Sequence, residues 1–166
     1  MKIAVTGHRP NKLGNEYDGI GKYSDAIRDR MAEVIKDHKP TQIITGMALG
    51  VDMLWAEMAI INNIPFIAAI PCKDQEKMWP KKSQDRYNRI VNHPLCTKYY
   101  VSEKPYTNSC MQARNVWMSD NCDILLAIWD GSAGGTKNCY DYAFHIKKQQ
   151  VPVIRINPLL FKFSNI

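Results

Sequence analysis

The strongest constraint on the fold is an alternation of short apolar runs with longer segments of helical periodicity. The apolar runs are KIAV, TQIIT, IPFIAAI, TKYYVS, DILLAIW and VPVIRI, and helices are predicted between them over residues 20–37, 51–62, 82–91, 109–120 and 136–149. In the first of these helices, apolar residues recur at near-helical spacing from Ile20 to Ile35. The repeated strand–helix order predicts an α/β fold with a mainly parallel sheet between two layers of helices.

Length and composition indicate one folded domain over residues 1–166. Apolar residues make up 45% of the chain and charged residues 23%, as in ordinary globular proteins. No apolar stretch approaches the roughly 20 residues of a membrane span, and the opening MKIAVTG lacks the long apolar segment of a signal peptide. We therefore expect a cytoplasmic protein with no membrane partner.

Cysteine usage and net charge narrow the classes of ligand. The cysteines show no CxxC spacing, so we expect buried free thiols, no metal site and no cofactor. The formal charge of +6 suits phosphate-bearing partners, but the basic residues are spread along the chain without a concentrated block. Small anionic ligands fit this charge as well as nucleic acid does. The five cysteines are Cys72, Cys96, Cys110, Cys122 and Cys139.

Two loops that follow the first and second apolar runs have the residues of an anion site. Ligands of open α/β sheets bind at the carboxyl ends of the strands. The first run leads into residues 6–10, TGHRP, and the second into TGMALGVDMLWAE, where Gly46 and Gly50 flank a turn and Asp52 opens a helix. A glycine turn before a helix presents free backbone N–H groups to anions. Glycine in a tight turn also needs no ligand, and Asp52 can simply favour the helix dipole.

The loop after DILLAIW is richer in glycine. Gly131, Gly134 and Gly135 allow a backbone to approach a ligand closely, and Thr136 adds a hydroxyl. The loop lacks the spacing and the Lys-Ser/Thr pair of a Walker A motif, and no GxGxxG follows the first strand. A phosphate-cradling loop is predicted, without ATP hydrolysis by the P-loop route. If the first strand lies between the second and the fifth, all three loops meet in one cleft; the position of the fourth strand stays open.

Four motifs in order carry a family resemblance. TGHRPNKLG, TGMALGVDMLWAE, RNVWMSDNCDILLAIWDG and GGTKNCYDYA resemble the YpsA-like family of bacterial and phage proteins, within the Rossmann-like SLOG superfamily that includes the DprA and LOG proteins. The resemblance implies a single Rossmann-like three-layer domain, a nucleotide-derived ligand and a homodimer or higher oligomer. The expected binding residues are Thr6, Gly7, His8, Arg9, Gly46, Met47, Gly50, Asp52, Arg114, Asn115, Asp130, Gly131, Gly134, Gly135, Thr136 and Asn138.

One departure from the family pattern bears on catalysis. LOG-type phosphoribohydrolases carry a PGGxGTxxE-like motif whose glutamate works with an upstream arginine. Here Gly135 and Thr136 are followed by Lys137, Asn138 and Cys139, so the glutamate is missing. Asparagine can hydrogen-bond a ribose or a base but cannot act as a general acid or base. The leading hypothesis is a protein that binds a nucleotide or its derivative as a sensor or sequestering protein, with little or no catalysis.

Two alternatives come from other functional classes. The first is a hydrolase of the phosphoribohydrolase type, in which Asp130 or Asp52 replaces the missing acid or base. The second is a DprA-like binder of single-stranded DNA, favoured by the basic charge and by Trp55, Trp79 and Tyr87 as exposed aromatics. Burial of Trp55 and of Trp117 against the sheet is the simpler interpretation of those tryptophans.

Overall fold

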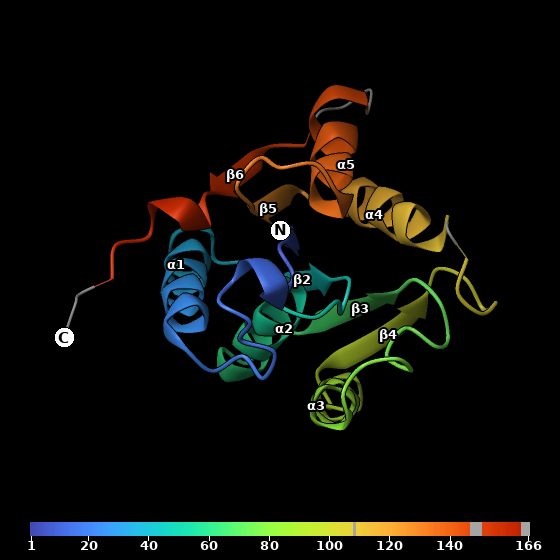
Figure 1. Cartoon of the computed structure of the whole chain (residues 1–166). Coiled ribbons are helices and arrows are strands. Elements are labelled where there is room, and N and C mark those ends of the chain that lie inside the picture. Colours follow the sequence, from blue (N-terminus) through green and yellow to red (C-terminus); the bar gives the residue numbers. More distant parts are fainter. Residues whose placement is uncertain (108, 147–150, 164–166) are drawn as a thin grey trace.

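Six strands form one parallel sheet in a computed structural model that describes residues 1–107, 109–146 and 151–163. The order is β4-β3-β2-β1-β5-β6 (Figure 1), and Ile3 of β1 pairs with Ile43 of β2 and with Ile124 of β5. The first strand is therefore central, and the fourth lies at an edge. The strands are β1 (Lys2–Gly7), β2 (Gln42–Thr45), β3 (Phe66–Ile70), β4 (Cys96–Tyr100), β5 (Ile124–Ile128) and β6 (Val153–Ile156).

Helices cover both faces of this sheet. In Figure 1, α1, α2 and α3 lie on one side, and α4 and α5 lie on the other. The predicted Rossmann-like α/β architecture, with a layer of helices on each face, is confirmed. The helices are α1 (Lys22–His38), α2 (Val51–Ile61), α3 (Lys81–Val91), α4 (Cys110–Asn121) and α5 (Gly135–Asp141).

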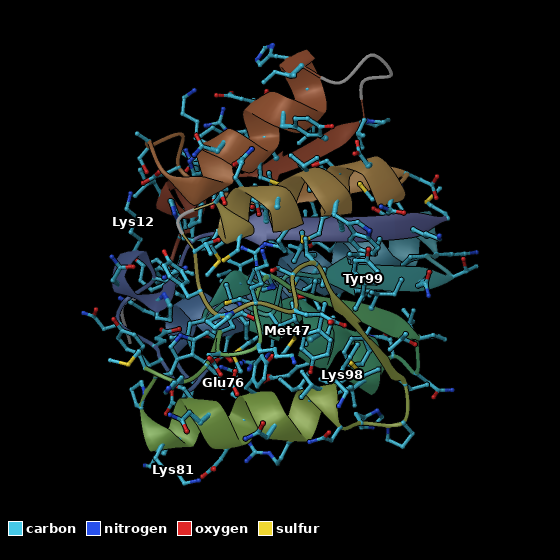
Figure 2. All side chains as sticks on the ribbon, turned by 90° about the vertical axis from the view of Figure 1, so that its right-hand side faces the viewer. Lys12, Met47, Glu76, Lys81, Lys98 and Tyr99 are labelled. Atoms are coloured by element: carbon cyan, nitrogen blue, oxygen red, sulfur yellow. The ribbon has the colours of Figure 1, made fainter. Side chains whose placement is uncertain are left out.

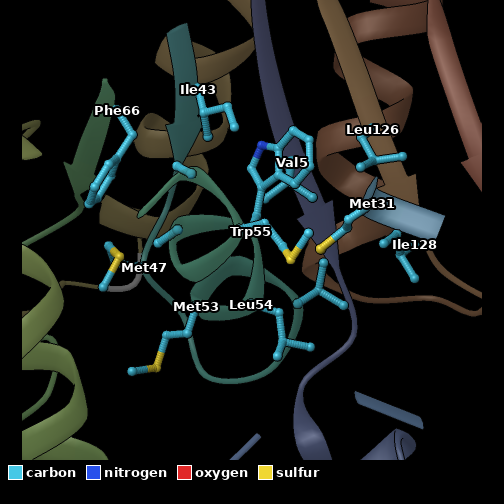
Figure 3. Close-up of a cluster of buried hydrophobic side chains, with 14 of the residues drawn as sticks. Val5, Met31, Ile43, Met47, Met53, Leu54, Trp55, Phe66, Leu126 and Ile128 are labelled. Carbon is cyan, nitrogen blue, oxygen red and sulfur yellow. The ribbon is translucent and has the colours of Figure 1, made fainter. Parts of the chain in front are cut away.

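The larger part of the core lies between the sheet and the α1–α3 layer. Trp55 of α2 is fully buried there among Val5, Met31 and Leu126 (Figure 3), and its Nε1 donates to the carbonyl oxygen of Ile3 at 3.3 Å. A smaller cluster that includes Met118 fills the other face. Burial of both faces explains why the central strands are continuous apolar runs.

The first helix begins later than its apolar spacing predicts. It starts at Lys22, and Ile20 lies outside it with 73% of its surface exposed. The carboxylate of Glu16 accepts hydrogen bonds from the backbone N–H groups of Tyr23 at 3.0 Å and Ser24 at 2.6 Å. These are the N–H groups that a helix start leaves without intrahelical partners, so Glu16 determines where the helix begins.

The predicted fifth helix divides into two parts. It is α-helical only over Gly135–Asp141 and continues as a π-helical turn over Tyr142–Ile146. Residues 147–149, the end of the predicted helix, lie outside the described residues. The π turn keeps Ala143 buried, and the backbone N–H of Val151 donates to its carbonyl oxygen at 3.2 Å.

Two of the three aromatics that the DNA-binding alternative needs at the surface are buried, as the simpler interpretation predicted for Trp55. Trp55 is 0% exposed and Tyr87 is 4% exposed, because both pack into the core between the sheet and its helices. Trp79 is half-buried, with its ring edge-to-face on Tyr87 at a centroid distance of 5.6 Å. Trp117 is also half-buried and stacks on Tyr99 at 4.3 Å (Tyr99 is labelled in Figure 2).

All five cysteines are free thiols, and four of them are buried. Within the described ranges, no helix is long and apolar enough to cross a membrane. The same residues contain no group of three histidine, cysteine or acidic side chains that could hold a metal ion.

Candidate functional site

The order of the strands brings three loops together at the carboxyl edge of the sheet. Because β1 lies between β2 and β5, the loops that follow these strands are neighbours. A cavity of about 260 Å³ opens between them and α4. The expected residues that line it are Thr6, Gly7, His8, Arg9, Asp52, Arg114, Asn115, Gly134, Gly135 and Thr136.

Arg114 is the buried cation of this cavity. Its exposed fraction is 7%. Its Nη1 donates to the carbonyl oxygen of Gly46 at 2.7 Å, and its Nε donates to Oδ1 of Asn115 at 3.0 Å. These bonds hold the guanidinium at one angle, so its charge is fixed in the wall of the cavity.

Asp52 is the acid nearest to that guanidinium. Its Oδ2 lies 4.0 Å from Nη1 of Arg114 and accepts a hydrogen bond from the backbone N–H of Ala48 at 3.3 Å. Burial raises the pKa of Asp52 above its usual range, although Arg114 acts in the opposite direction. Asp52 is therefore the acidic group of the cavity best suited to hold a proton.

The glycine-rich loop before α5 presents bare backbone to the cavity. Gly134 has a φ of +145°, which side chains rarely adopt, and a Cβ placed on Gly134 or Gly135 would meet no atom within 4 Å. Nδ2 of Asn115 donates to the carbonyl oxygen of Gly135 at 3.3 Å, and Nε1 of Trp129 donates to that of Ser132 at 2.8 Å. The loop is anchored from two sides and still leaves open space over its glycines.

Two further cations come from the loop after β1. Arg9 and Lys12 line the cavity and are exposed, and Lys12 is labelled at the edge of the molecule in Figure 2. Nζ of Lys12 donates to Oγ of Ser132 at 2.5 Å, so the loops after β1 and β5 touch at the cavity. The charged side chains in the lining are thus three cations and the buried Asp52.

A pairing of His8 with Asp130 holds the same two loops together. The backbone N–H of Asp130 donates to Nε2 of His8 at 3.0 Å, and Oδ1 of Asp130 accepts from the backbone N–H of Ser132 at 2.8 Å. Hydrogen bonds from Ser132 lower the pKa of Asp130 to about 2, and burial lowers the pKa of His8. A neutral imidazole that accepts at Nε2 matches this geometry.

Several expected binding residues lie outside the lining. Two of them, Gly46 and Gly50, leave space for residues that do line the cavity. Gly50 has a φ of +90°, and a Cβ there would lie 2.6 Å from the carbonyl oxygen of His8. A Cβ on Gly46 would lie 2.3 Å from Nη1 of Arg114. The expected residues absent from the lining are Gly46, Met47, Gly50, Asp130, Gly131 and Asn138.

The cavity also contains residues that the sequence analysis missed. Lys12 follows Arg9 by three residues inside the quoted motif TGHRPNKLG and ends a short 3₁₀ turn (Pro10–Lys12) that Arg9 precedes. Gln75 lies outside the lining, but its Nε2 donates at 3.1 Å to the carbonyl oxygen of Gly46 that Arg114 also uses. The lining residues not foreseen are Asn11, Lys12, Ala48, Met111, Trp129, Ser132 and Ala133.

Comparison with known proteins identifies the family. The YpsA family model, described as the YspA SLOG family, matches residues 3–161. The chain belongs to this family. A relative from Bacillus subtilis, the uncharacterized SPbeta prophage-derived protein YoqJ, is 34% identical over 137 residues, which cover 74% of this chain and 80% of the relative. A UPF0398 protein from Bacillus thuringiensis is 25% identical over 143 residues, with coverages of 81% and 77%.

Solved structures of DNA processing protein A share the fold of this YspA SLOG chain. The Helicobacter pylori protein, whose structure describes a single-stranded DNA binding mode, aligns with a TM-score of 0.63 at 20% identity over 93% of this chain. The Streptococcus pneumoniae protein aligns with a TM-score of 0.53 at 17% identity over 98% of this chain. The aligned region spans 64% and 62% of those two proteins, so the likeness concerns the fold of one part of them.

Proposed function

We propose that this chain binds a nucleotide or a nucleotide-derived small molecule in the cavity at the carboxyl edge of the sheet, as a sensor or sequestering protein. The observation that carries the proposal is the lining of that cavity. Arg9, Lys12 and Arg114 reach it from two different segments, and the only carboxylate among the described lining residues is the buried Asp52. The excess of positive charge favours an anionic ligand.

The glycine-rich loop supports phosphate as the anionic group. Open space over Gly134 and Gly135 allows oxygen atoms to approach the backbone closely, and Thr136 adds a hydroxyl from the start of α5. Arg9 is exposed and can turn toward a phosphate, and the exposed Lys12 can exchange its hydrogen bond to Ser132 for one to a phosphate oxygen. Arg114 and Asn115 then remain for the hydroxyl groups or the base of the ligand.

Binding without turnover is supported by the pKa of Asp130 and by the positions of the candidate catalytic residues relative to the cavity. Asp130 lies outside the lining, and its carboxylate, with a pKa of about 2, is a poor proton donor and a weak base at neutral pH. Cys139, which stands three residues after Thr136 where the LOG-type motif has its glutamate, is buried outside the lining, and Asn138 is exposed and also outside it. None of these residues supplies the acid–base pair that hydrolysis of an N-glycosidic bond needs.

Asp52 favours hydrolysis as a second candidate function. It is the acid that lines the cavity, and burial raises its pKa toward the range in which general acids work. A hydrolase of the phosphoribohydrolase type would use Asp52 to protonate the leaving base or to activate water. Multiple turnovers that disappear in Asp52→Asn while binding persists would establish this alternative.

Single-stranded DNA binding draws its support from the fold shared with the Helicobacter pylori protein and from the net charge of +6. The buried Trp55 and Tyr87 cannot stack on bases, which removes two of the aromatics on which the hypothesis depended.

Mass spectrometry of small molecules released by denaturing the purified protein tests the proposal. We expect an intact nucleotide or derivative from the parent and little from the double variant Arg9→Ala/Lys12→Ala. The matched control is Arg30→Ala/Lys36→Ala, which removes two exposed cations of α1 outside the cavity lining and should keep the ligand. A base together with a ribose phosphate would instead support the hydrolase. Absence of any phosphate-bearing molecule from parent and control would count against the proposal.

A further inference from the structure

A second cavity, of about 430 Å³, lies between the loop before α1 and the helices α1, α2 and α3. Its lining shares no residue with the first cavity. Arg28 comes from α1, Glu57 and Ile60 from α2, and Arg86 and Arg89 from α3. Three arginines from two helices thus line one cavity, which is unusual unless a ligand balances their charge.

Arg86 is the least solvated of these arginines. It is 6% exposed, its Nε donates to Oε1 of Glu57, and its Nη2 is buried without a hydrogen-bond partner among the described residues. Nη2 lies against Gly19, where a Cβ would be 2.4 Å away. A buried guanidinium nitrogen without a partner is costly, so a further acceptor beside Arg86 would be favourable.

The carboxylate that pairs with Arg86, that of Glu57, is already shared. Oε2 of Glu57 accepts a hydrogen bond from Nη2 of Arg28 at 3.4 Å, while Oε1 accepts from Arg86. Arg89 is exposed and makes no ion pair with any residue that the structure describes. Nη2 of Arg86 and the guanidinium of Arg89 thus keep donors that no described carboxylate pairs with, because the other acid of the lining, Asp18, accepts at Oδ1 from the backbone N–H of Ile20.

His93 adds a further donor to this wall. Its Nδ1 accepts a hydrogen bond from the backbone N–H of Leu95 at 3.2 Å, which leaves Nε2 as the ring nitrogen that can donate. Apart from Asp18, the remaining lining is aliphatic, with Ile20 at 73% exposure, Ile60 half-buried and Ile90 at 4% exposure. The cavity therefore offers hydrogen-bond donors and charge together with an apolar surface.

We infer that this cavity is a second ligand site, independent of the proposed nucleotide site, which takes a small monocarboxylate with an aliphatic body. The carboxylate pairs with Arg86 and Arg89, because the planar guanidinium matches two carboxylate oxygens. The isoleucines cover the aliphatic body. A ligand with a single negative charge is favoured, because Glu57 and Asp18 already offset two of the three arginine charges in the lining. Access to Nη2 of Arg86 requires the segment around Gly19 to shift outward.

Hexanoate is the probe for the test, and hexanol and inorganic phosphate are its controls. In ¹⁵N-edited NMR titrations of the full chain, hexanoate is expected to shift the amides of Gly19 and His93 while those of Gly134 and Gly135 stay in place. Hexanol lacks the charge and phosphate lacks the aliphatic body, so each should bind at least tenfold more weakly. Equal or tighter binding of phosphate, absence of hexanoate binding, or shifts confined to residues 131–136 would overturn the inference.

Variants at exposed positions keep the fold and locate the charge. Arg89→Gln removes a guanidinium, and we expect about tenfold weaker hexanoate binding, the lower range for a charge-assisted hydrogen bond. Ile20→Asp places a negative charge on the cavity wall and should abolish binding. Arg30→Gln, an exposed arginine of α1 outside the lining, is the matched control and should leave the affinity unchanged. Equal affinities in all three variants, with unchanged melting temperatures, would also overturn the inference.

Discussion

Arg9 and Arg114 line the same cavity but differ in what else they do. Arg9 is exposed, whereas Arg114 is buried and tied to Gly46 and Asn115. We predict that Arg9→Ala weakens nucleotide binding about ten- to a hundredfold, because a charge-assisted hydrogen bond contributes about 1.5–3 kcal/mol, and leaves the free energy of unfolding unchanged. Arg114→Ala should weaken binding and also lower the free energy of unfolding by about 1.5–3 kcal/mol. Calorimetric titration and urea denaturation measure the two effects, and equal stability losses in both variants would refute the distinction.

His8 makes the stability of the site dependent on pH. Burial lowers its pKa below the ordinary value of 6.5, so the folded chain binds the proton less readily than the unfolded chain does. The stabilisation is present above pH 6.5 and is lost as the pH falls below that value. In His8→Gln the amide oxygen can still accept from the backbone N–H of Asp130, and this titration is absent. We expect the parent to lose more free energy of unfolding than His8→Gln between pH 7.5 and pH 5.5, as measured by urea denaturation; parallel losses would contradict this.

The sequence predicted only some of the side chains that face the cavity. The quoted motifs contain most of its lining, because glycine turns and polar residues after buried strands mark the carboxyl ends of strands. Asp130 fits the same pattern, but its carboxylate binds the backbone of Ser132 two residues later, a local hydrogen bond that sequence cannot distinguish from ligand binding. Gln75 carried no signal at all, since its role depends on a contact with Gly46, 29 residues away in the chain.

At the scale of elements, the glycines of the two strand–helix turns have different functions. Gly50 is required by the backbone, because its φ is +90° and a Cβ would lie 2.6 Å from the carbonyl oxygen of His8. Gly135 is the first residue of α5 and has no such restriction, since a Cβ there would meet no atom within 4 Å. Under the proposed function, its role is to let the ligand approach the backbone.

Two alanine substitutions test this assignment. Gly50→Ala should lower the free energy of unfolding by about 3 kcal/mol, the upper range for a strained backbone. Gly135→Ala should change it by less than about 1 kcal/mol, because alanine is the better helix former, and yet weaken nucleotide binding about tenfold. Urea denaturation and titration give the two quantities. A Gly135→Ala variant with unaltered affinity would show that the loop does not approach a ligand closely.

The boundaries of the elements were less predictable than their type. Apolar runs and helical periodicity located the six strands and five α-helices of the described residues, but α1 begins two residues later than expected because Glu16 binds the N–H groups of Tyr23 and Ser24. The α-helical geometry also stops at Asp141, before the apolar pattern does. Both differences arise from contacts between residues that a periodic pattern does not describe.

For the whole molecule, the central position of β1 was predictable and the place of β4 was not. The three loops can meet in one cleft only if β1 lies between β2 and β5. The strand order of the sheet confirms this position of β1. No such argument placed β4, which lies at the edge with Tyr99 and Tyr100 about two-fifths exposed. An edge strand carries backbone groups without partners, and pairing with a second chain is one way to satisfy them.

We predict an assembly of more than one chain, as the family resemblance implies. Light scattering at micromolar concentrations should give a mass above the 19.0 kDa of one chain. Tyr99→Lys, which places a charge on the exposed edge strand, should shift the assembly toward the monomer by mass action. A parent protein that stays monomeric across the concentration series, with and without nucleotide, would contradict this prediction.

The most direct test of the central claim, nucleotide binding without turnover, is incubation of the purified parent with a panel of nucleotides, followed by separation of bound from free ligand and chromatography of both. We predict retention of one class of nucleotide in a stoichiometric amount, recovered intact, and loss of that retention in Arg9→Ala/Lys12→Ala but not in Arg30→Ala/Lys36→Ala. Retention of no nucleotide, or multiple turnovers that vanish in Asp52→Asn, would contradict the account.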